Sequence, residues 1–137
     1  MQFKEIHIGK MIEARSKELD IDYSRLNNFL QLSDEQIKET FTKESIDSLL
    51  LLRWSKILNY DFFRVYSQHL IFYSPISIVE KEPKKSVLPQ FRKNIYTQEV
   101  INFIVNQVQK GTKTKMQIIQ EYGIPKTTLY KWLKKYN

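Results

Sequence analysis

The sequence of 137 residues contains no cysteine, only three glycines and only two histidines. The absence of cysteine excludes disulfide bonds and thiolate metal sites. The histidines, His7 and His69, lie far apart and have no His or carboxylate partner at a suitable spacing. We therefore expect no metal site and no acid–base pair.

Long apolar runs are also missing. The longest, at residues 49–52 and 70–73, are far too short to span a bilayer. The first ten residues, MQFKEIHIGK, do not resemble a signal peptide. We therefore expect a cytoplasmic, nucleoid-associated protein of a cell without a nucleus, with no membrane contact.

Motifs of catalysis are absent as well, because the chain has no Gly-rich phosphate-binding loop and no nucleophile motif. We predict that the protein is not an enzyme and that it binds no cofactor and no small-molecule ligand.

The chain does contain apolar material. Hydrophobic residues make up 42% of it and aromatic residues 13%, which is enough for packed cores.

Positive charge is concentrated in the second half of the chain. Residues 1–74 hold ten Lys and Arg against eleven Asp and Glu, a net charge of −1, whereas residues 75–137 hold twelve against four, a net charge of +8. Clustered cations favour a polyanionic partner, because neutralising phosphates releases counterions. The alternative is a charged face that only keeps the protein soluble.

Prolines and lysines separate two regions with helical patterns. The interruption contains Pro75, Pro83 and Pro89, together with the polar run EKEPKKS. We predict an all-α fold of two small helix-turn-helix modules joined by this linker. The predicted parts are residues 1–74, a linker of residues 75–94, and residues 95–137. In the linker, Arg92 and Lys93 are candidates for phosphate contacts.

The apolar spacing of the first module predicts five helices. They are expected at about residues 6–19, 22–30, 34–41, from residue 45 or 47 to 58, and 61–66. Asp22 and Ser33 are the expected N-caps of the second and third. Residues 68–74 either extend the fifth helix or form an exposed strand.

The second module is predicted to contain three helices. Thr97 caps the first and Gly111 ends it, and Thr114 caps the second, residues 115–122. Gly123 supplies the positive φ of a tight turn, and Pro125 fits the first turn of the last helix. This is the layout of a helix-turn-helix.

The last helix has one apolar and one basic side. Its apolar stripe consists of Leu129, Trp132, Leu133 and Tyr136, at positions i, i+3, i+4 and i+7. The opposite side carries Lys126, Thr127, Tyr130, Lys131 and Lys134. Such a helix is expected to bury one side and to offer the other to phosphates or bases.

The segment GIPKTTLYKWLKKY and the helix before it resemble the helix-turn-helix of insertion-sequence transposases and their companion proteins. The resemblance covers residues 97–137, with one departure at Ile119, where a small residue is usual. It implies that the major groove of double-stranded DNA is read by Lys126, Thr127, Thr128, Tyr130 and Lys131. Phosphate contacts are expected from Lys113, Lys115, Lys134 and Lys135.

The first module opens with Ile8-Gly9-Lys10, and its core positions carry Leu26, Leu30, Leu32, Ser33 and Ile37. On these residues, positions 8–63 resemble the lambda-repressor-like (Xre-type) helix-turn-helix family. The chain departs from that family at Asn27, where a small residue is usual, and at Gln31, where the turn glycine is usual. Its third helix begins with Asp34 and Glu35, and Glu39 follows one turn later. Because carboxylates repel phosphate, we expect this module to bind a partner rather than DNA.

A homodimer through the N-terminal module is one such role. The aromatic-rich stretch that is a candidate for the contact, or for core packing, contains Phe62, Phe63, Tyr66, Leu70, Phe72 and Tyr73.

We favour a protein that binds DNA in a sequence-specific manner and acts as a bacterial transcriptional regulator. The alternatives are a transposition-associated DNA-binding protein without a catalytic domain and a helical protein-interaction adaptor.

Overall fold

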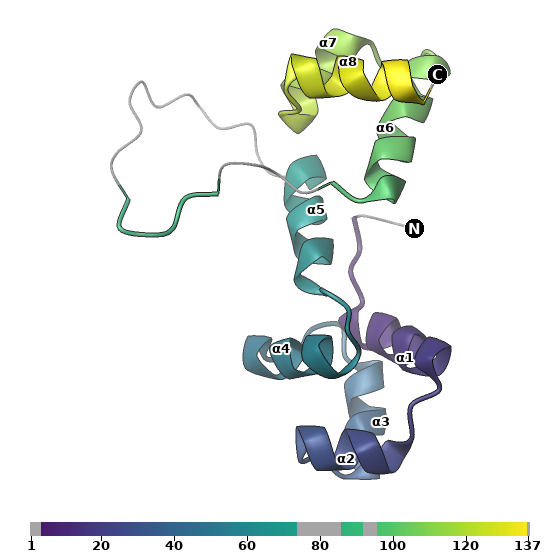
Figure 1. Cartoon of the computed structure of the whole chain (residues 1–137), viewed down its shortest axis with the longest axis vertical. Coiled ribbons are helices and arrows are strands. Elements are labelled where there is room, and N and C mark those ends of the chain that lie inside the picture. Colours follow the sequence, from purple (N-terminus) through teal and green to yellow (C-terminus); the bar gives the residue numbers. More distant parts are fainter. Residues whose placement is uncertain (1–3, 74–85, 92–95, 137) are drawn as a thin grey trace. The chain divides into compact units, whose positions relative to one another are not determined.

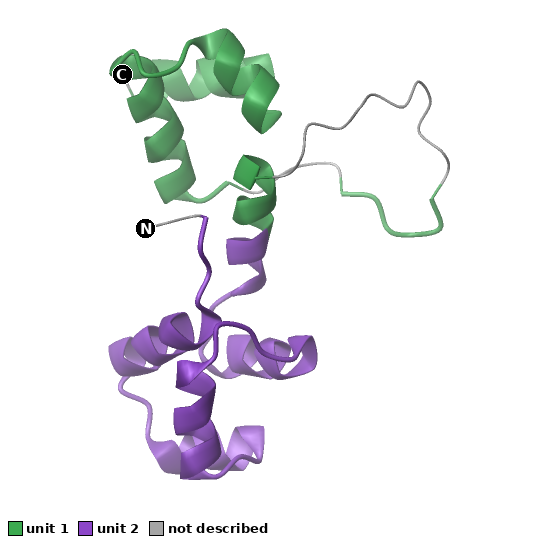
Figure 2. Ribbon diagram, turned by 180° about the vertical axis from the view of Figure 1, so that it is seen from behind, with its two compact units in different colours: residues 1, 67–137 green, residues 2–66 purple. Residues whose placement is uncertain are grey.

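The computed structural model describes residues 4–73, 86–91 and 96–136. All regular elements in these ranges are helices, so the predicted all-α fold is confirmed (Figure 1). The contacts divide the chain into two compact units, residues 2–66 and residues 67–137 (Figure 2). This division falls within helix α5 (Phe63–Tyr73), whereas the sequence predicted a first module that ends at residue 74.

Short helices build the N-terminal unit before α5. They are α1 (Ile8–Leu19), α2 (Tyr23–Leu30), α3 (Asp34–Thr42) and α4 (Ser48–Ile57). His7 Nδ1 accepts a hydrogen bond from the Lys10 amide at 3.1 Å, which starts α1 two residues later than expected. Ser33 forms a capping box with Gln36 as predicted for α3. Asp22 occupies the N-cap of α2 without a side-chain cap hydrogen bond.

One apolar cluster holds this unit together. It consists of Ile8, Ile12, Leu26, Leu30, Ile37, Leu51, Trp54, Leu58 and Phe62. These residues lie on the apolar faces that the helical spacing predicts, so burial of those faces supplies the main driving force for folding.

The start of α1 lies against the end of α3. The amides of Ile8 and Gly9 donate to the carbonyls of Glu44 and Lys43, both at 2.9 Å. A Cβ atom on Gly9 would lie 2.6 Å from the carbonyl oxygens of Phe41 and Lys43, which is closer than real Cβ contacts. Glycine is therefore required here by the close approach of the two backbones.

The turn between α2 and α3 is left-handed although it contains no glycine. Gln31 adopts the left-handed conformation, with φ 56° and ψ 42°, and its amide donates to the Asn27 carbonyl at 2.9 Å. The Asn27 amide group donates to the Leu32 carbonyl at 2.7 Å across the turn. Arg53 of α4 donates to the Leu30 carbonyl at 3.2 Å, which satisfies an orphan carbonyl at the end of α2.

Helix α5 continues past residue 66 to Tyr73, so the first of the two alternatives for this segment, an extension of the fifth helix, is confirmed. The strand alternative for residues 68–73 is therefore wrong. Packing within the unit of residues 67–137 explains the extension: Gln68 is 2% exposed, and the Phe72 ring makes edge contacts with Phe103 and Tyr122, with centroids 5.3 and 5.0 Å apart. Part of the aromatic-rich stretch is thus used for packing.

Three helices complete the C-terminal unit. They are α6 (Gln98–Gln109), α7 (Lys115–Tyr122) and α8 (Lys126–Lys135). Thr97 caps α6 as predicted, and Gly111 follows its end with φ 74°. The core of these helices consists of Val100, Ile104, Val105, Ile118, Ile124, Leu129 and Trp132.

The linker is described only at residues 86–91, so Arg92 and Lys93 lie outside the described residues. No helix in the described part of the chain is long and apolar enough to cross a bilayer. Within the same ranges, no three His, Cys, Asp or Glu side chains gather as a metal site would require.

Candidate nucleic-acid interface

The turn between α7 and α8 is built from local sequence signals. Thr114 and Gln117 form a capping box at the start of α7, with the Thr114 amide 2.8 Å from Gln117 Oε1. Gly123 ends α7 in the left-handed conformation with φ 63°, as predicted. Pro125 lies at the N-cap of α8 rather than inside its first turn, and Ile124 between them is fully buried.

Helix α8 separates its two faces as the stripe predicts. Leu129 is 0% exposed and Trp132 is 8% exposed, so the apolar side lies in the core. The exposed side presents Lys126, Thr127, Tyr130, Lys131, Lys134 and Lys135. Thr128 is half-buried, so it is the least accessible of the five residues expected to read bases.

The structure brings two lysines from different helices to one exposed tyrosine. Lys115 Nζ at the start of α7 lies 5.2 Å from the centroid of the Tyr130 ring, and Lys126 Nζ at the start of α8 lies 5.4 Å from it. Cations over a ring face are held by attraction to the ring quadrupole. The predicted phosphate contact Lys115 and the predicted base-reading residues Lys126 and Tyr130 therefore share one surface.

Lys113 differs from the other lysines because its charge is engaged inside the unit. Its ammonium group contacts the Glu121 carboxylate and lies 3.1 Å from the Tyr122 hydroxyl and 4.8 Å from the centre of the Tyr122 ring. The hydrogen bond to Glu121, followed by the one to Tyr122, raises the pKa of Lys113 above its ordinary value. Lys113 precedes α7 and Glu121 lies in its last turn, and this separation of eight positions gave no signal for the pair.

Contacts with α6 and with Tyr96, which precedes it, fix the end of α8. The Tyr96 ring meets the Trp132 ring edge-on at 4.9 Å. The Tyr136 hydroxyl donates to Gln98 Oε1 at 3.4 Å, and Gln109 Nε2 donates to the Tyr136 carbonyl at 3.4 Å. These contacts fix the position of α8 in the unit and therefore the positions of its exposed lysines.

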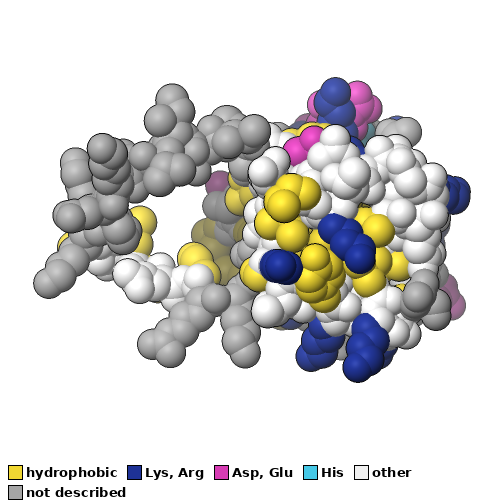
Figure 3. Space-filling view, turned by 90° about the horizontal axis from the view of Figure 1, so that it is seen from above, with side chains coloured by type: hydrophobic (Ala, Val, Ile, Leu, Met, Phe, Trp, Pro, Cys, Tyr) yellow, Lys and Arg dark blue, Asp and Glu magenta, His cyan; other side chains and the backbone are white. Residues whose placement is uncertain are grey.

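Positive charge dominates the described part of this unit. Residues 96–136 contain seven lysines and two glutamates, a net charge of +5. Figure 3 shows lysine side chains lying around and between apolar side chains on the face turned toward the viewer. Met116, 63% exposed, is an accessible apolar residue on α7 that the sequence analysis did not select. Such a surface can bind phosphates through its cations and contact bases through its apolar groups.

The exposed side of α3 has the opposite character. Asp34, Glu35 and Glu39 are all exposed beside Lys38. Glu39 lies 3.5 Å from Lys43 in a helical ion pair, which is the only partner among the described residues that the structure records for these three carboxylates. A helix with these three acids would be repelled by a phosphate backbone.

Comparisons with known proteins agree with the C-terminal geometry. Residues 103–137 match the family described as "Helix-turn-helix domain". This match covers α7, α8 and the end of α6, and such a domain suggests DNA binding. Domains of this kind typically have no enzymatic activity.

A more distant similarity covers most of the chain. "Nucleolar complex protein 4 homolog" from Danio rerio is 27% identical over an alignment of 115 residues, and the alignment covers 75% of this chain and 22% of that protein. The chain thus spans about a fifth of the length of this relative. No solved structure matches the chain.

Proposed function

We propose that this protein is a sequence-specific DNA-binding protein that acts as a transcriptional regulator and reads the major groove with α8. The proposal rests on the exposed side of α8, which carries lysines and a tyrosine. The opposite side of the helix is anchored in the core by Leu129 and Trp132, which are buried. A major groove admits one α-helix, and a helix-turn-helix places its second helix there.

The exposed residues divide into two roles. Base edges are assigned to Lys126, Thr127, Thr128, Tyr130 and Lys131. Lysines donate to guanine O6 and N7, and threonine offers a hydroxyl and a methyl group to base edges. Phosphates are assigned to Lys113, Lys115, Lys134, Lys135, Arg92 and Lys93. Within this group Lys113 has the least free charge, because Glu121 neutralises it.

The N-terminal unit has a different role in this proposal. Its left-handed turn at Gln31 and its capped α3 support a lambda-repressor-like arrangement, while Asp34, Glu35 and Glu39 disfavour DNA. We assign it to self-association. Two α8 helices spaced by one turn of duplex, roughly 34 Å, gain affinity because the second contact becomes intramolecular.

Fluorescence polarisation with duplex DNA across a salt series tests the DNA contact. After a preferred site has been selected from random duplexes, Lys131→Ala should cost about 1–3 kcal/mol on that site. Lys135→Ala should weaken all sequences alike and lower the salt slope by about 1. Equal losses from both substitutions on every sequence would contradict base reading by Lys131.

Further results of these experiments separate the alternatives. A duplex RNA should compete poorly, because its major groove is too narrow for side chains to read. Absence of DNA binding at low salt would reject both DNA-binding functions and leave the adaptor. A selected site that lies in the terminal inverted repeats of a mobile element would favour the transposition-associated role.

A further inference from the structure

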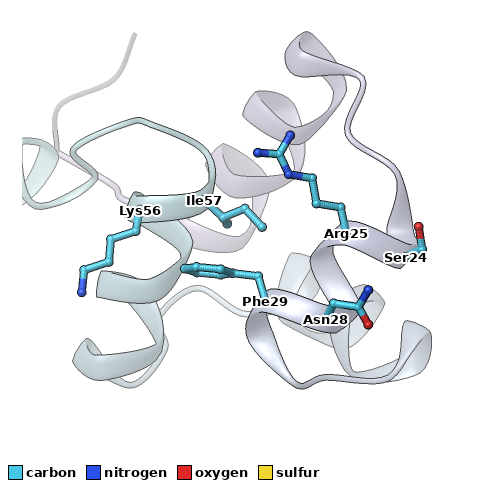
Figure 4. A pocket seen from close by; sticks show the side chains of 6 residues that line it. All are labelled: Ser24, Arg25, Asn28, Phe29, Lys56 and Ile57. Carbon is cyan, nitrogen blue, oxygen red and sulfur yellow. The ribbon is translucent and has the colours of Figure 1, made fainter.

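Two hollows of opposite charge lie side by side on the N-terminal unit, one on each side of the start of α2. The first has a volume of 590 Å³ and is lined by Ser24, Arg25, Asn28, Phe29, Lys56 and Ile57. Figure 4 shows Phe29 reaching from α2 toward Ile57 of α4, with Arg25 and Lys56 at its sides. This basic hollow has an apolar wall, two cations and no acid.

The second hollow is acidic. It has a volume of 320 Å³, and its lining includes Glu13, Lys17, Asp20, Asp22 and Tyr23. Tyr23 is 39% exposed and gives this hollow an apolar edge comparable to Phe29, which is 41% exposed. Three acids and one lysine leave a net charge of −2, against +2 for the basic hollow.

Within the described part of one copy of the chain, most charged side chains that line the two hollows make no ion pair. Glu13 is paired with Lys17 at 3.4 Å. Among the described residues, no ion pair engages Arg25, Lys56, Asp20 or Asp22. Arg25 and Asp22 lie three positions apart across the beginning of α2, so both hollows open beside the same helix end.

We propose that the acidic side chains lining the second hollow of one copy pair with the basic side chains lining the first hollow of a second copy, so that the chain forms a two-fold dimer through the start of α2. Arg25 of each copy then meets Asp22 of the other, and Phe29 and Tyr23 supply the apolar contact. A two-fold axis makes both contacts at once, because the same surface serves both copies. The surface gives a location to the self-association proposed above and rests on it.

A second copy fits better than DNA. Phosphate would meet Arg25 and Lys56 but would be repelled by Asp20 and Asp22 beside them. The N-terminal unit has a net charge of −1, so two of these units approach each other without strong repulsion. Because the paired charges lie near solvent, the dimer weakens as salt rises.

Sedimentation velocity of the full chain at low and high salt tests this surface by charge exchange. Arg25→Glu places two repulsive pairs in the dimer, and so does Asp22→Lys. Each variant alone should dimerise at least about tenfold more weakly than the natural chain. An equimolar mixture should recover dimers, since both contacts are attractive again when one chain of each kind pairs. A misfolded variant would not recover in this way.

Lys38→Glu is the matched control, because it makes the same change of charge on the exposed side of α3, outside both hollows. It should leave dimerisation unchanged. Arg25→Glu and Lys38→Glu should bind a single DNA half-site with equal affinity.

Three results of the sedimentation experiment would overturn the proposal: a natural chain that is monomeric at all concentrations, single variants that dimerise normally, or a mixture that stays monomeric. Normal dimerisation of the single variants rejects the surface and leaves self-association intact. Weaker half-site binding by Arg25→Glu than by Lys38→Glu identifies Arg25 as a DNA contact and also rejects the surface. None of these results alters the test of Lys131.

Discussion

Replacing Leu129 with alanine separates the folding of the DNA-binding unit from its contact with DNA. Leu129 is 0% exposed in the middle of α8, and a buried Leu→Ala change costs about 2–5 kcal/mol. At about 0.05–0.15 kcal/mol per residue, the roughly 50 residues of the end of α5 and of α6–α8 provide only about 2.5–7.5 kcal/mol of stability. The substitution should therefore unfold α6–α8 in a large fraction of molecules at 25 °C.

Hydrogen–deuterium exchange of the full chain, read peptide by peptide, measures this effect. Leu129→Ala should raise exchange throughout α6, α7 and α8 and leave α1–α4 protected, because the two groups of helices have separate cores. Lys131→Ala is the control on the same helix, since its exposed side chain makes no core contact. Both variants should lose affinity for the selected DNA site, but only Leu129→Ala should lose protection.

Two outcomes would refute this reasoning. Unchanged exchange in α6–α8 would mean that the unit has far more stability than its small core allows. Equal loss of protection in α1–α4 would mean that the two units fold as one cooperative structure, contrary to the division of the chain between residues 66 and 67.

Three other substitutions test the packing. Gly9→Ala should destabilise the N-terminal unit by more than about 2 kcal/mol in urea titration, because the new Cβ would overlap carbonyls at the end of α3; an unchanged midpoint would contradict this. Gln31→Gly should stabilise the same unit by about 0.5–1 kcal/mol by relieving a left-handed backbone at φ 56°; a lower midpoint would show that its side chain matters more. Glu121→Gln should destabilise the C-terminal unit at pH 7. Since the folded state raises the pKa of Lys113, the stability from this pair is present below pH 10.5 and is lost as the pH rises through the folded value. The difference from the natural chain should therefore shrink above that pH, and a constant difference would point to another cause.

Helix positions followed from the sequence wherever local chemistry determines them. The caps Ser33 and Thr114 and the glycine turn at Gly123 lie where the sequence predicts, because each depends on residues within one turn of the chain. The two faces of α8 were also predictable, since helical periodicity alone decides which side becomes apolar.

Features that depend on tertiary contacts were not predictable in the same way. The sequence left residues 68–74 open between a helix and a strand, and the helix observed up to Tyr73 depends on Phe72 meeting Phe103 and Tyr122, residues far away in the sequence. The engagement of Lys113 by Glu121 likewise requires the turn of α7 to bring them together. A sequence shows the charge of such a lysine but does not show which partner satisfies it.

The two left-handed turns show why geometry alone does not assign function in this chain. Gln31 and Gly123 adopt nearly the same backbone conformation before a short helix. After Gln31 the exposed side of the helix carries Asp34, Glu35 and Glu39, and after Gly123 it carries lysines. A phosphate backbone attracts the second helix and repels the first at any orientation that would bring bases within reach. The surface charge of each second helix, rather than its turn, is therefore the feature on which we propose that α8 meets DNA and that the N-terminal unit makes contacts between copies of the chain.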